Sequence, residues 1–240
     1  MRLRESINAP GIGEFSFEFH FQPKVCLRQP SRRVVGHEAL LRLRFKDAGV
    51  VGPGAFFAAL KRSEGEGLAL RRIMALAALD HAIEAAKILR CGIAINIDPC
   101  LLADGFFLDR LESRPPPNPA ITLEIIEAAT PACLDAVAKG VCRARSAGYR
   151  VALDDFGMAE SNMIRLARLM VDEVKIDALL LDHARGRAML PHIVLAIHAV
   201  GAEACIEGVE TIEHHLAAAE SGAGAAQGFF YGPPGPIRWV

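Results

Sequence analysis

Val151-Ala152-Leu153-Asp154-Asp155-Phe156-Gly157 is the stretch around which the rest of the sequence can be interpreted. Its apolar residues are typical of a buried strand, and this strand ends at two adjacent carboxylates. Neighbouring aspartates repel each other and lose hydration when buried, so a fold that places them at a buried strand end usually neutralises them. A divalent metal pair would do this. The alternative is a strand followed by a polar turn, with Asp155 capping the next helix.

The composition predicts a soluble α/β protein of the cytoplasm. With 240 residues, 52% of them hydrophobic, the chain can bury the core of one large domain or two small ones. Its formal net charge of −1 shows no excess of basic residues of the kind that binds a DNA or RNA duplex. We expect neither a signal peptide nor a membrane helix, because no apolar run is long enough. The six cysteines contain no CxxC pair, so we expect free thiols in a reducing compartment.

Two strands are predicted near the N-terminus. The residues from Phe15 to Phe21 alternate between phenylalanine and a polar side chain, which predicts a strand that ends at Gln22-Pro23. A second strand, residues 34–43, contains Glu38 and is close enough in sequence to pair with the first as a hairpin. Residues 1–13 precede this hairpin as a poorly ordered N-terminal tail.

From residue 55 onward, helix and strand patterns alternate. Helices are predicted at 55–62, 67–90, 99–112, 132–147, 161–169, 187–200 and 211–221. Strands are predicted at 92–97, 120–126, 149–155, 172–177, 202–207 and 226–231. With the hairpin these make eight strands, which predicts one α/β domain over residues 14–240, a (β/α)8 TIM-like barrel. An open doubly wound sheet is the other arrangement of this pattern, but no glycine-rich phosphate loop follows the first strand.

Polar side chains recur at or near the carboxyl ends of the predicted strands. In a (β/α)8 barrel these ends meet at one face, where such enzymes place their chemistry. Each residue alone could be a helix cap, a turn residue or a solvated charge, but that explanation would be needed for every one of them. A convergent site is therefore favoured. Its members are Asn96, Glu124, Asp154, Asp155, Lys175, Glu207 and Gln227.

These residue types suit a particular chemistry. Carboxylate and amide oxygens, without histidine or cysteine, are typical ligands of hard cations such as Mg²⁺ or Mn²⁺. Because the carboxylates exceed what one Mg²⁺ normally takes from protein, two metals are plausible, and such a pair can clamp both oxygens of a phosphoryl displacement. A lysine among them can orient the attacking water or neutralise charge on phosphate. The residues thus predict phosphodiester hydrolysis.

Eight motifs then carry a resemblance to a known family. They are Phe21-Gln22-Pro23, Glu38-Ala39-Leu40-Leu41-Arg42, Ile95-Asn96-Ile97, Leu123-Glu124-Ile125-Ile126-Glu127, Asp154-Asp155-Phe156-Gly157, Val174-Lys175-Ile176-Asp177, Glu207-Gly208-Val209-Glu210-Thr211 and Gln227-Gly228. In this order and spacing, over about residues 15–236, they resemble the EAL-domain family of cyclic di-GMP phosphodiesterases.

The resemblance implies a barrel with an antiparallel first strand, in agreement with the predicted hairpin. It also implies two Mg²⁺ or Mn²⁺ ions, with Ca²⁺ as an inhibitor. The implied ligands are Glu38, Asn96, Glu124 and Asp154 for the first metal, and Asp154, Asp155 and Glu207 for the second. The implied reaction is hydrolysis of one bond of cyclic di-GMP, which gives linear pGpG, and the family's tendency to form homodimers suggests a homodimer here.

Further roles follow from the same resemblance. Glu38, Lys175 and Glu207 would be the catalytic residues, with Lys175 in contact with the catalytic water. The substrate phosphate or guanine would be held by Gln22, Arg42 and Gln227, the arginine through its planar fork. Two supporting residues are implied as well: Glu127 would anchor the loop after Asp155, and Glu210 would support the metal site.

One segment departs from the family pattern. After Asp-Asp-Phe-Gly the family usually has Thr or Ala, then Gly, an aromatic residue and two small hydroxyl residues, whereas this chain has Met158-Ala159-Glu160-Ser161-Asn162. The change removes a glycine that can adopt positive φ and hydroxyls that could order the loop. Two hypotheses therefore remain: an active metal-dependent phosphodiesterase, or a catalytically weak module that binds cyclic di-GMP or another protein.

Overall fold

The structure is a computed structural model. It describes residues 5–9, 13–28, 33–45, 49–51, 54, 66–118, 120–126, 134–157 and 162–237. The predicted helix 55–62, Glu127 and residues 158–161 of the altered loop lie outside this part of the chain. Among the described helices, none combines the length and the apolar composition that a membrane crossing requires.

Eight strands close into a ring. In ring order they pair as β2-β10-β9-β8-β7-β6-β5-β3, and β3 pairs back onto β2. Their bounds are β2 (Gly13–Cys26), β3 (Val34–Phe45), β5 (Gly92–Ile97), β6 (Ile121–Ile125), β7 (Arg150–Phe156), β8 (Glu173–Ile176), β9 (Glu203–Ile206) and β10 (Ala225–Gln227). The strand β2 runs antiparallel to both its neighbours, and the other neighbouring pairs of the ring are parallel. The predicted barrel with an antiparallel first strand is therefore confirmed.

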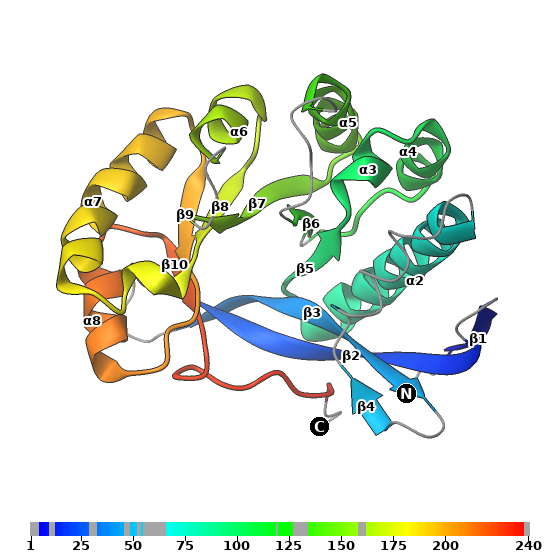
Figure 1. Ribbon diagram of the computed structural model, residues 1–240, viewed down its shortest axis with the longest axis horizontal. Coiled ribbons are helices and arrows are strands. Elements are labelled where there is room, and N and C mark those ends of the chain that lie inside the picture. The colour runs from blue at the N-terminus through cyan, green and yellow to red at the C-terminus, as the bar shows by residue number, and fades with distance from the viewer. Residues whose placement is uncertain are drawn as a thin grey trace.

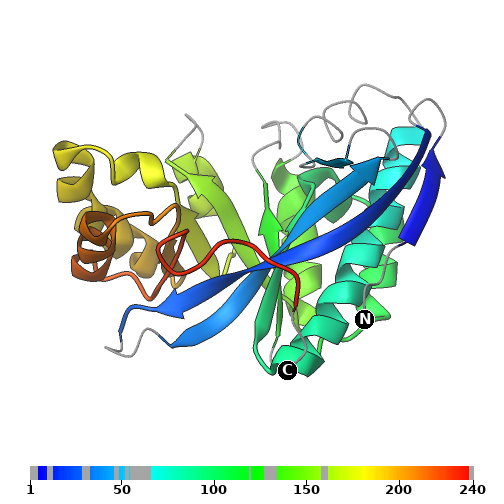
Figure 2. The same ribbon diagram turned by 90° about the horizontal axis from the view of Figure 1, so that it is seen from below.

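The helices surround most of this ring. In Figure 1 they form an arc outside the strands, from α2 beside β5 round to α8 beside β10. Their bounds are α2 (Glu66–Leu89), α3 (Pro99–Leu102), α4 (Gly105–Glu112), α5 (Leu134–Ser146), α6 (Asn162–Arg168), α7 (Ala184–Ala199) and α8 (Ile212–Glu220), with a 3-10 turn η2 at Ala178–Leu180. Figure 2 shows the C-terminal segment crossing β2, to which it is joined by a backbone pairing between Gly235 and Phe21.

The parallel strands bury apolar side chains on one face, as their sequences predict. Val151 and Leu153 on β7 are fully buried, as are Ile93 on β5 and Ile121 on β6. Helix α5 comes so close to α3 that a Cβ atom added at Gly140 would lie 1.7 Å from the carbonyl oxygen of Leu102. Apolar strands with helices packed against them position the polar strand ends that follow.

Several sequence predictions need correction. The tail expected over residues 1–13 is not wholly irregular, because β1 (Glu5–Ala9) pairs with the start of β2. The strand expected to end at Pro23 continues to Cys26, since β10, about 200 residues later, supplies backbone partners for its last three residues. The helix expected at 99–112 is two helices, because Asp104 ends the first turn and caps the second helix by accepting from the Phe107 N–H. A short strand, β4 (Gly49–Val51), extends the hairpin and was not predicted.

Candidate active site

A single buried lysine lies among four carboxylates at the carboxyl ends of the strands. Lys175 on β8 is 1% exposed. Its Nζ atom lies 2.7 Å from Glu124 Oε2, 2.8 Å from Glu207 Oε1, 3.1 Å from Asp154 Oδ1 and 3.3 Å from Glu38 Oε2. These carboxylates come from β6, from the residue after β9, from β7 and from β3. The fold therefore brings these strand ends to one point, as the barrel requires.

Amide side chains hold Glu38 from both sides. Asn96 Nδ2 donates to Glu38 Oε1 at 2.8 Å, and Gln227 Nε2 donates to Glu38 Oε2 at 2.7 Å. Gln227 Nε2 also lies 3.1 Å from Gln22 Oε1, and Gln22 Nε2 donates to the Gly232 carbonyl at 3.3 Å. The two glutamines are buried, and Gln227 contacts Glu38 directly while Gln22 contacts Gln227 and Gly232. Their predicted contacts with the substrate stay a prediction.

A bulge re-aims the two aspartates of the opening motif. Adjacent residues of a regular strand point to opposite faces. Here the pairing of β7 with β8 shifts register between Leu153 and Phe156, and Asp155 has a left-handed backbone, with φ 54°. As a result, carboxylate oxygens of Asp154, Asp155 and Glu207 lie within 4.8 Å of one another. Bulges next to active sites commonly redirect a side chain in this way.

The same residues fit a divalent cation. Asp154 Oδ1 lies 3.1 Å from Lys175 Nζ and Glu124 Oε1 lies 3.9 Å from Lys24 Nζ, and neither buried oxygen accepts a hydrogen bond within the described part of the chain. The carboxylates of this group outnumber the two lysines, and a buried carboxylate that no cation neutralises is costly. Oxygen donors without sulfur or imidazole suit a hard cation. The group formed by Asp154, Asp155 and Glu207 could therefore hold a metal ion.

The buried glutamates of the site have pKa values that are shifted in opposite directions. Burial raises the pKa of Glu207 to about 8, with the charges of Asp154 and Glu38 adding to it and Lys175 opposing. Burial also acts on Glu38, but the Lys175 charge and the donated hydrogen bonds outweigh it and lower the pKa to about 2. Burial, reinforced by Glu38, raises the pKa of Glu124 well above its usual range. Burial disfavours the Lys175 ammonium, yet the surrounding carboxylates raise its pKa well above normal.

A second lysine lies deeper in the barrel. Lys24 on β2 is 7% exposed and forms an ion pair with Glu173, while its Nζ lies 3.9 Å from Glu124 Oε1. Sequence reasoning missed Lys24. The signal was its spacing of two from Gln22, which puts both side chains on one face of the strand.

Two of the remaining predicted residues lie apart from the carboxylates. Arg42 is half-buried on β3 and donates from Nη1 to the Leu41 carbonyl at 3.0 Å. Glu210 is exposed, and within the described part of the chain no hydrogen bond or ion pair joins it to the carboxylate group.

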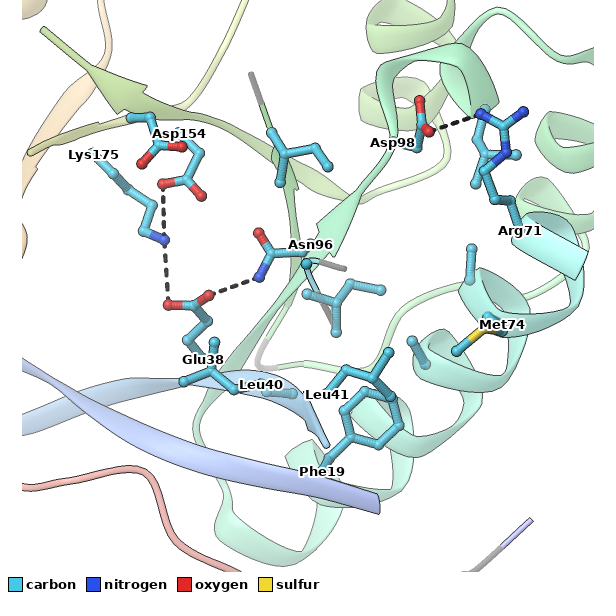
Figure 3. A pocket seen from close by; sticks show the side chains of 18 of the residues that line it. Phe19, Glu38, Leu40, Leu41, Arg71, Met74, Asn96, Asp98, Asp154 and Lys175 are labelled. Carbon is cyan, nitrogen blue, oxygen red and sulfur yellow. Dashed lines mark hydrogen bonds and ion pairs between the residues drawn. The ribbon is translucent and has the colours of Figure 1, made fainter. Parts of the chain in front are cut away.

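A cavity of about 580 Å³ opens beside the carboxylates. Glu38, Asn96, Asp154, Asp155, Lys175 and Glu207 line one end of it. Figure 3 shows Arg71 and Asp98 at the far end, with Phe19, Leu41 and Met74 along one side of the cavity. Sequence reasoning did not single out Arg71 or Asp98, because helical periodicity alone does not show which neighbour a helix faces. A volume of this size is typical of small-molecule sites.

Comparisons with known proteins agree with this architecture. The EAL domain family matches residues 3–234. The cyclic di-GMP phosphodiesterase RocR of Pseudomonas aeruginosa is 26% identical over 245 residues, which cover 94% of this chain and 59% of RocR. MucR of the same organism, a bifunctional diguanylate cyclase and cyclic di-GMP phosphodiesterase, is 29% identical, and the match covers 91% of this chain and 33% of MucR. The chain thus spans 59% of the length of RocR and 33% of the length of MucR, less than two thirds of each.

Solved structures give the same result. The MucR phosphodiesterase in complex with cyclic di-GMP superimposes with a TM-score of 0.79 at 26% identity and covers 92% of each chain. An EAL domain protein of Listeria monocytogenes EGD-e has a TM-score of 0.76 at 25% identity, covering 92% of this chain and 89% of the other. With a family match over nearly the whole chain and the same closed barrel, this chain belongs to the EAL domain family.

Proposed function

We propose that this chain hydrolyses cyclic di-GMP to linear pGpG. The observation that carries the proposal is the group of four carboxylates around the Lys175 ammonium, beside a cavity of about 580 Å³. Family membership supports it, as do the names of RocR and MucR. Water would add to one phosphorus, the bond from that phosphorus to the 3′ oxygen would break, and the 3′ oxygen would leave as a hydroxyl.

We assign Mg²⁺ or Mn²⁺ to this site, with two ions per chain. One would be held by Asp154, Asp155 and Glu207, whose oxygens already lie within 4.8 Å. The other would be held by Glu38, Asn96 and Glu124 together with Asp154. When bound, such ions lower the pKa of water and offset negative charge that develops on phosphate.

The chain's own residues would position the reactants. The Lys175 ammonium, fixed by its carboxylates, would donate to the attacking water or to a phosphate oxygen. Gln227 and Asn96 would keep the Glu38 carboxylate in place through the hydrogen bonds described above. Phosphate binding by Arg42, and the supporting roles of Glu127 and Glu210, stay predictions from the family resemblance.

The direct test is product detection. The protein is incubated with cyclic di-GMP and Mg²⁺ or Mn²⁺, and pGpG is measured by chromatography, with EDTA as the metal-free control. We expect pGpG from the native protein, none with EDTA, and a large loss of turnover in Glu38→Gln. Glu84→Gln is a matched control, because Glu84 is an exposed glutamate on α2 whose side chain is 55% exposed.

A second candidate is binding of cyclic di-GMP without turnover. It is favoured by the sequence Met158-Ala159-Glu160-Ser161-Asn162, which lacks the glycine and the adjacent small hydroxyl pair usual in the family. Measurable nucleotide binding without any pGpG, with both Mg²⁺ and Mn²⁺, would reject hydrolysis and leave this receptor role.

A further inference from the structure

The cavity has two chemically different ends. Carboxylates and Lys175 occupy the end at the strand termini, whereas Arg71 reaches the other end from helix α2 (Figure 3). One wall of the cavity is apolar and includes Phe19, Leu41 and Met74. A phosphate bound near the carboxylates would therefore leave room for a flat apolar group along this wall, with the arginine beyond it.

Arg71 is held in place by contacts that leave part of its guanidinium available. Its Nε donates to the Gly67 carbonyl at 3.2 Å and its Nη1 to Asp98 Oδ2 at 3.0 Å. Asp98 is fixed in turn, because its Oδ1 accepts from the Cys100 N–H at 2.9 Å and caps α3. The described residues provide no acceptor for Nη2. A fixed guanidinium with unused N–H donors at a cavity wall is suited to recognise a partner with paired acceptors.

The neighbouring residue provides an internal comparison. Arg72, also on α2, forms an ion pair with Asp104, and Asp104 caps α4 just as Asp98 caps α3. Both ion pairs connect α2 to the start of a following helix. The two arginines therefore do not differ in their contribution to helix packing. Only the first pair, Arg71 with Asp98, belongs to the residues that line the cavity. The position of Arg71 therefore points to a ligand as well as to helix packing.

We propose that Arg71 recognises the guanine base of the bound nucleotide and that Asp98 is its positioning residue. Guanine presents two acceptors, O6 and N7, on one edge, and arginine is the side chain that pairs with them best. Adenine presents N7 and an amino donor on that edge, so its N6–H would face an arginine N–H. The inference rests on the proposed function, because it assumes that the cavity binds a guanine dinucleotide. It makes Arg71 a specificity residue for guanine over adenine.

The test compares binding of cyclic di-GMP and cyclic di-AMP by isothermal titration calorimetry in the presence of Ca²⁺, because Mn²⁺ would support hydrolysis during the titration. The variants are Arg71→Met, Arg71→Lys and the matched control Arg72→Met. We expect Arg71→Met to weaken cyclic di-GMP binding roughly tenfold or more, the discrimination typical of a lost arginine–guanine pair, and to abolish the preference over cyclic di-AMP. Arg71→Lys keeps a charge for Asp98 and the fold, but lacks the planar fork, so it should lose the preference as well.

The outcomes separate the inference from the proposed function. A native protein that prefers cyclic di-GMP, with the preference lost in both Arg71 variants and kept in Arg72→Met, supports the inference. Equal effects of Arg71→Met and Arg72→Met, or equal weakening of both nucleotides, would overturn it while hydrolysis of cyclic di-GMP still stands. A native protein that binds both nucleotides equally would also overturn it. A native protein that binds neither would overturn the proposed function, and the inference with it.

Discussion

Replacement of Lys175 by methionine tests the charge balance of the site without an activity assay. The Nζ atom lies within 3.3 Å of carboxylate oxygens from Glu38, Glu124, Asp154 and Glu207. Glu38, whose pKa is lowered to about 2, is ionised at neutral pH. At about 3 Å and an effective dielectric constant of about 20, its attraction to the ammonium is roughly 5 kcal/mol before hydration is subtracted. Removing one partner from a buried ion pair costs about 3–5 kcal/mol, because the other charge stays buried. In a chain of this size that predicts a melting temperature lower by about 6–20 °C.

The assay is thermal and urea unfolding at neutral pH in EDTA. Lys87→Met is the control, since Lys87 is 56% exposed and pairs with Glu84 on the helix surface, where a salt bridge contributes about 0–1 kcal/mol. The deficit of Lys175→Met should shrink as the pH falls, because protonation of the carboxylates removes their repulsion. If Lys175→Met unfolds at the same temperature as the native protein and as Lys87→Met, the carboxylates are not charged around this lysine and the electrostatic account of the site is wrong.

Three further predictions follow from the same structure. The pKa of Glu207 is raised from 4.5 to about 8, so folding favours its protonated form. The resulting contribution to stability is fully present below pH 4.5 and should be lost as the pH rises from there through about 8 in EDTA, and added Mn²⁺, which binds the carboxylate, should reverse the loss in urea unfolding. Asp155→Asn can keep the left-handed backbone, so we expect native stability and weaker Mn²⁺ binding by calorimetry. Asp155→Val should lose about 1–3 kcal/mol of stability, because a β-branched residue is strained there. Equal stability of the two variants would contradict the φ of 54° at Asp155. Gly140→Ala should lower the urea midpoint of unfolding, because the new Cβ would meet the Leu102 carbonyl. This holds although alanine is about 1 kcal/mol more favourable than glycine within a helix. A higher midpoint would show that α5 and α3 are not in contact there.

The sequence predicted the parts of the fold that local patterns determine. Alternation of apolar strands with helices was enough for the barrel, since every parallel strand must end at the same face. That rule also predicts that Glu124, Asp154 and Lys175 lie together, as the structure confirms. The last residues of β2 were missed because their partners lie about 200 residues away, at β10. Strand β1 was missed although its partner is the adjacent start of β2.

Details of the site depended on neighbours that no local pattern reveals. An Asp-Asp pair does not disclose that a register shift turns Asp155 toward Glu207. Nor does a helical pattern show that Arg71 contacts Asp98 at the cavity wall while Arg72 contacts Asp104 outside the cavity. The homodimer, the cytoplasmic location and the lack of duplex nucleic-acid binding stay predictions.

Closure of the ring between β2 and β10 has a consequence for biosynthesis. Gln227 donates to Gln22 and to Glu38 across sequence separations of 205 and 189 residues. A chain emerging from the ribosome can therefore form most parallel pairings early, yet Glu38 acquires this hydrogen bond only after nearly all of the domain has been synthesised. Such long-range pairing is slow, because the entropy of closing the loop must be lost first. The nascent chain should consequently remain without a finished site, and exposed to chaperones, until its last strand is released.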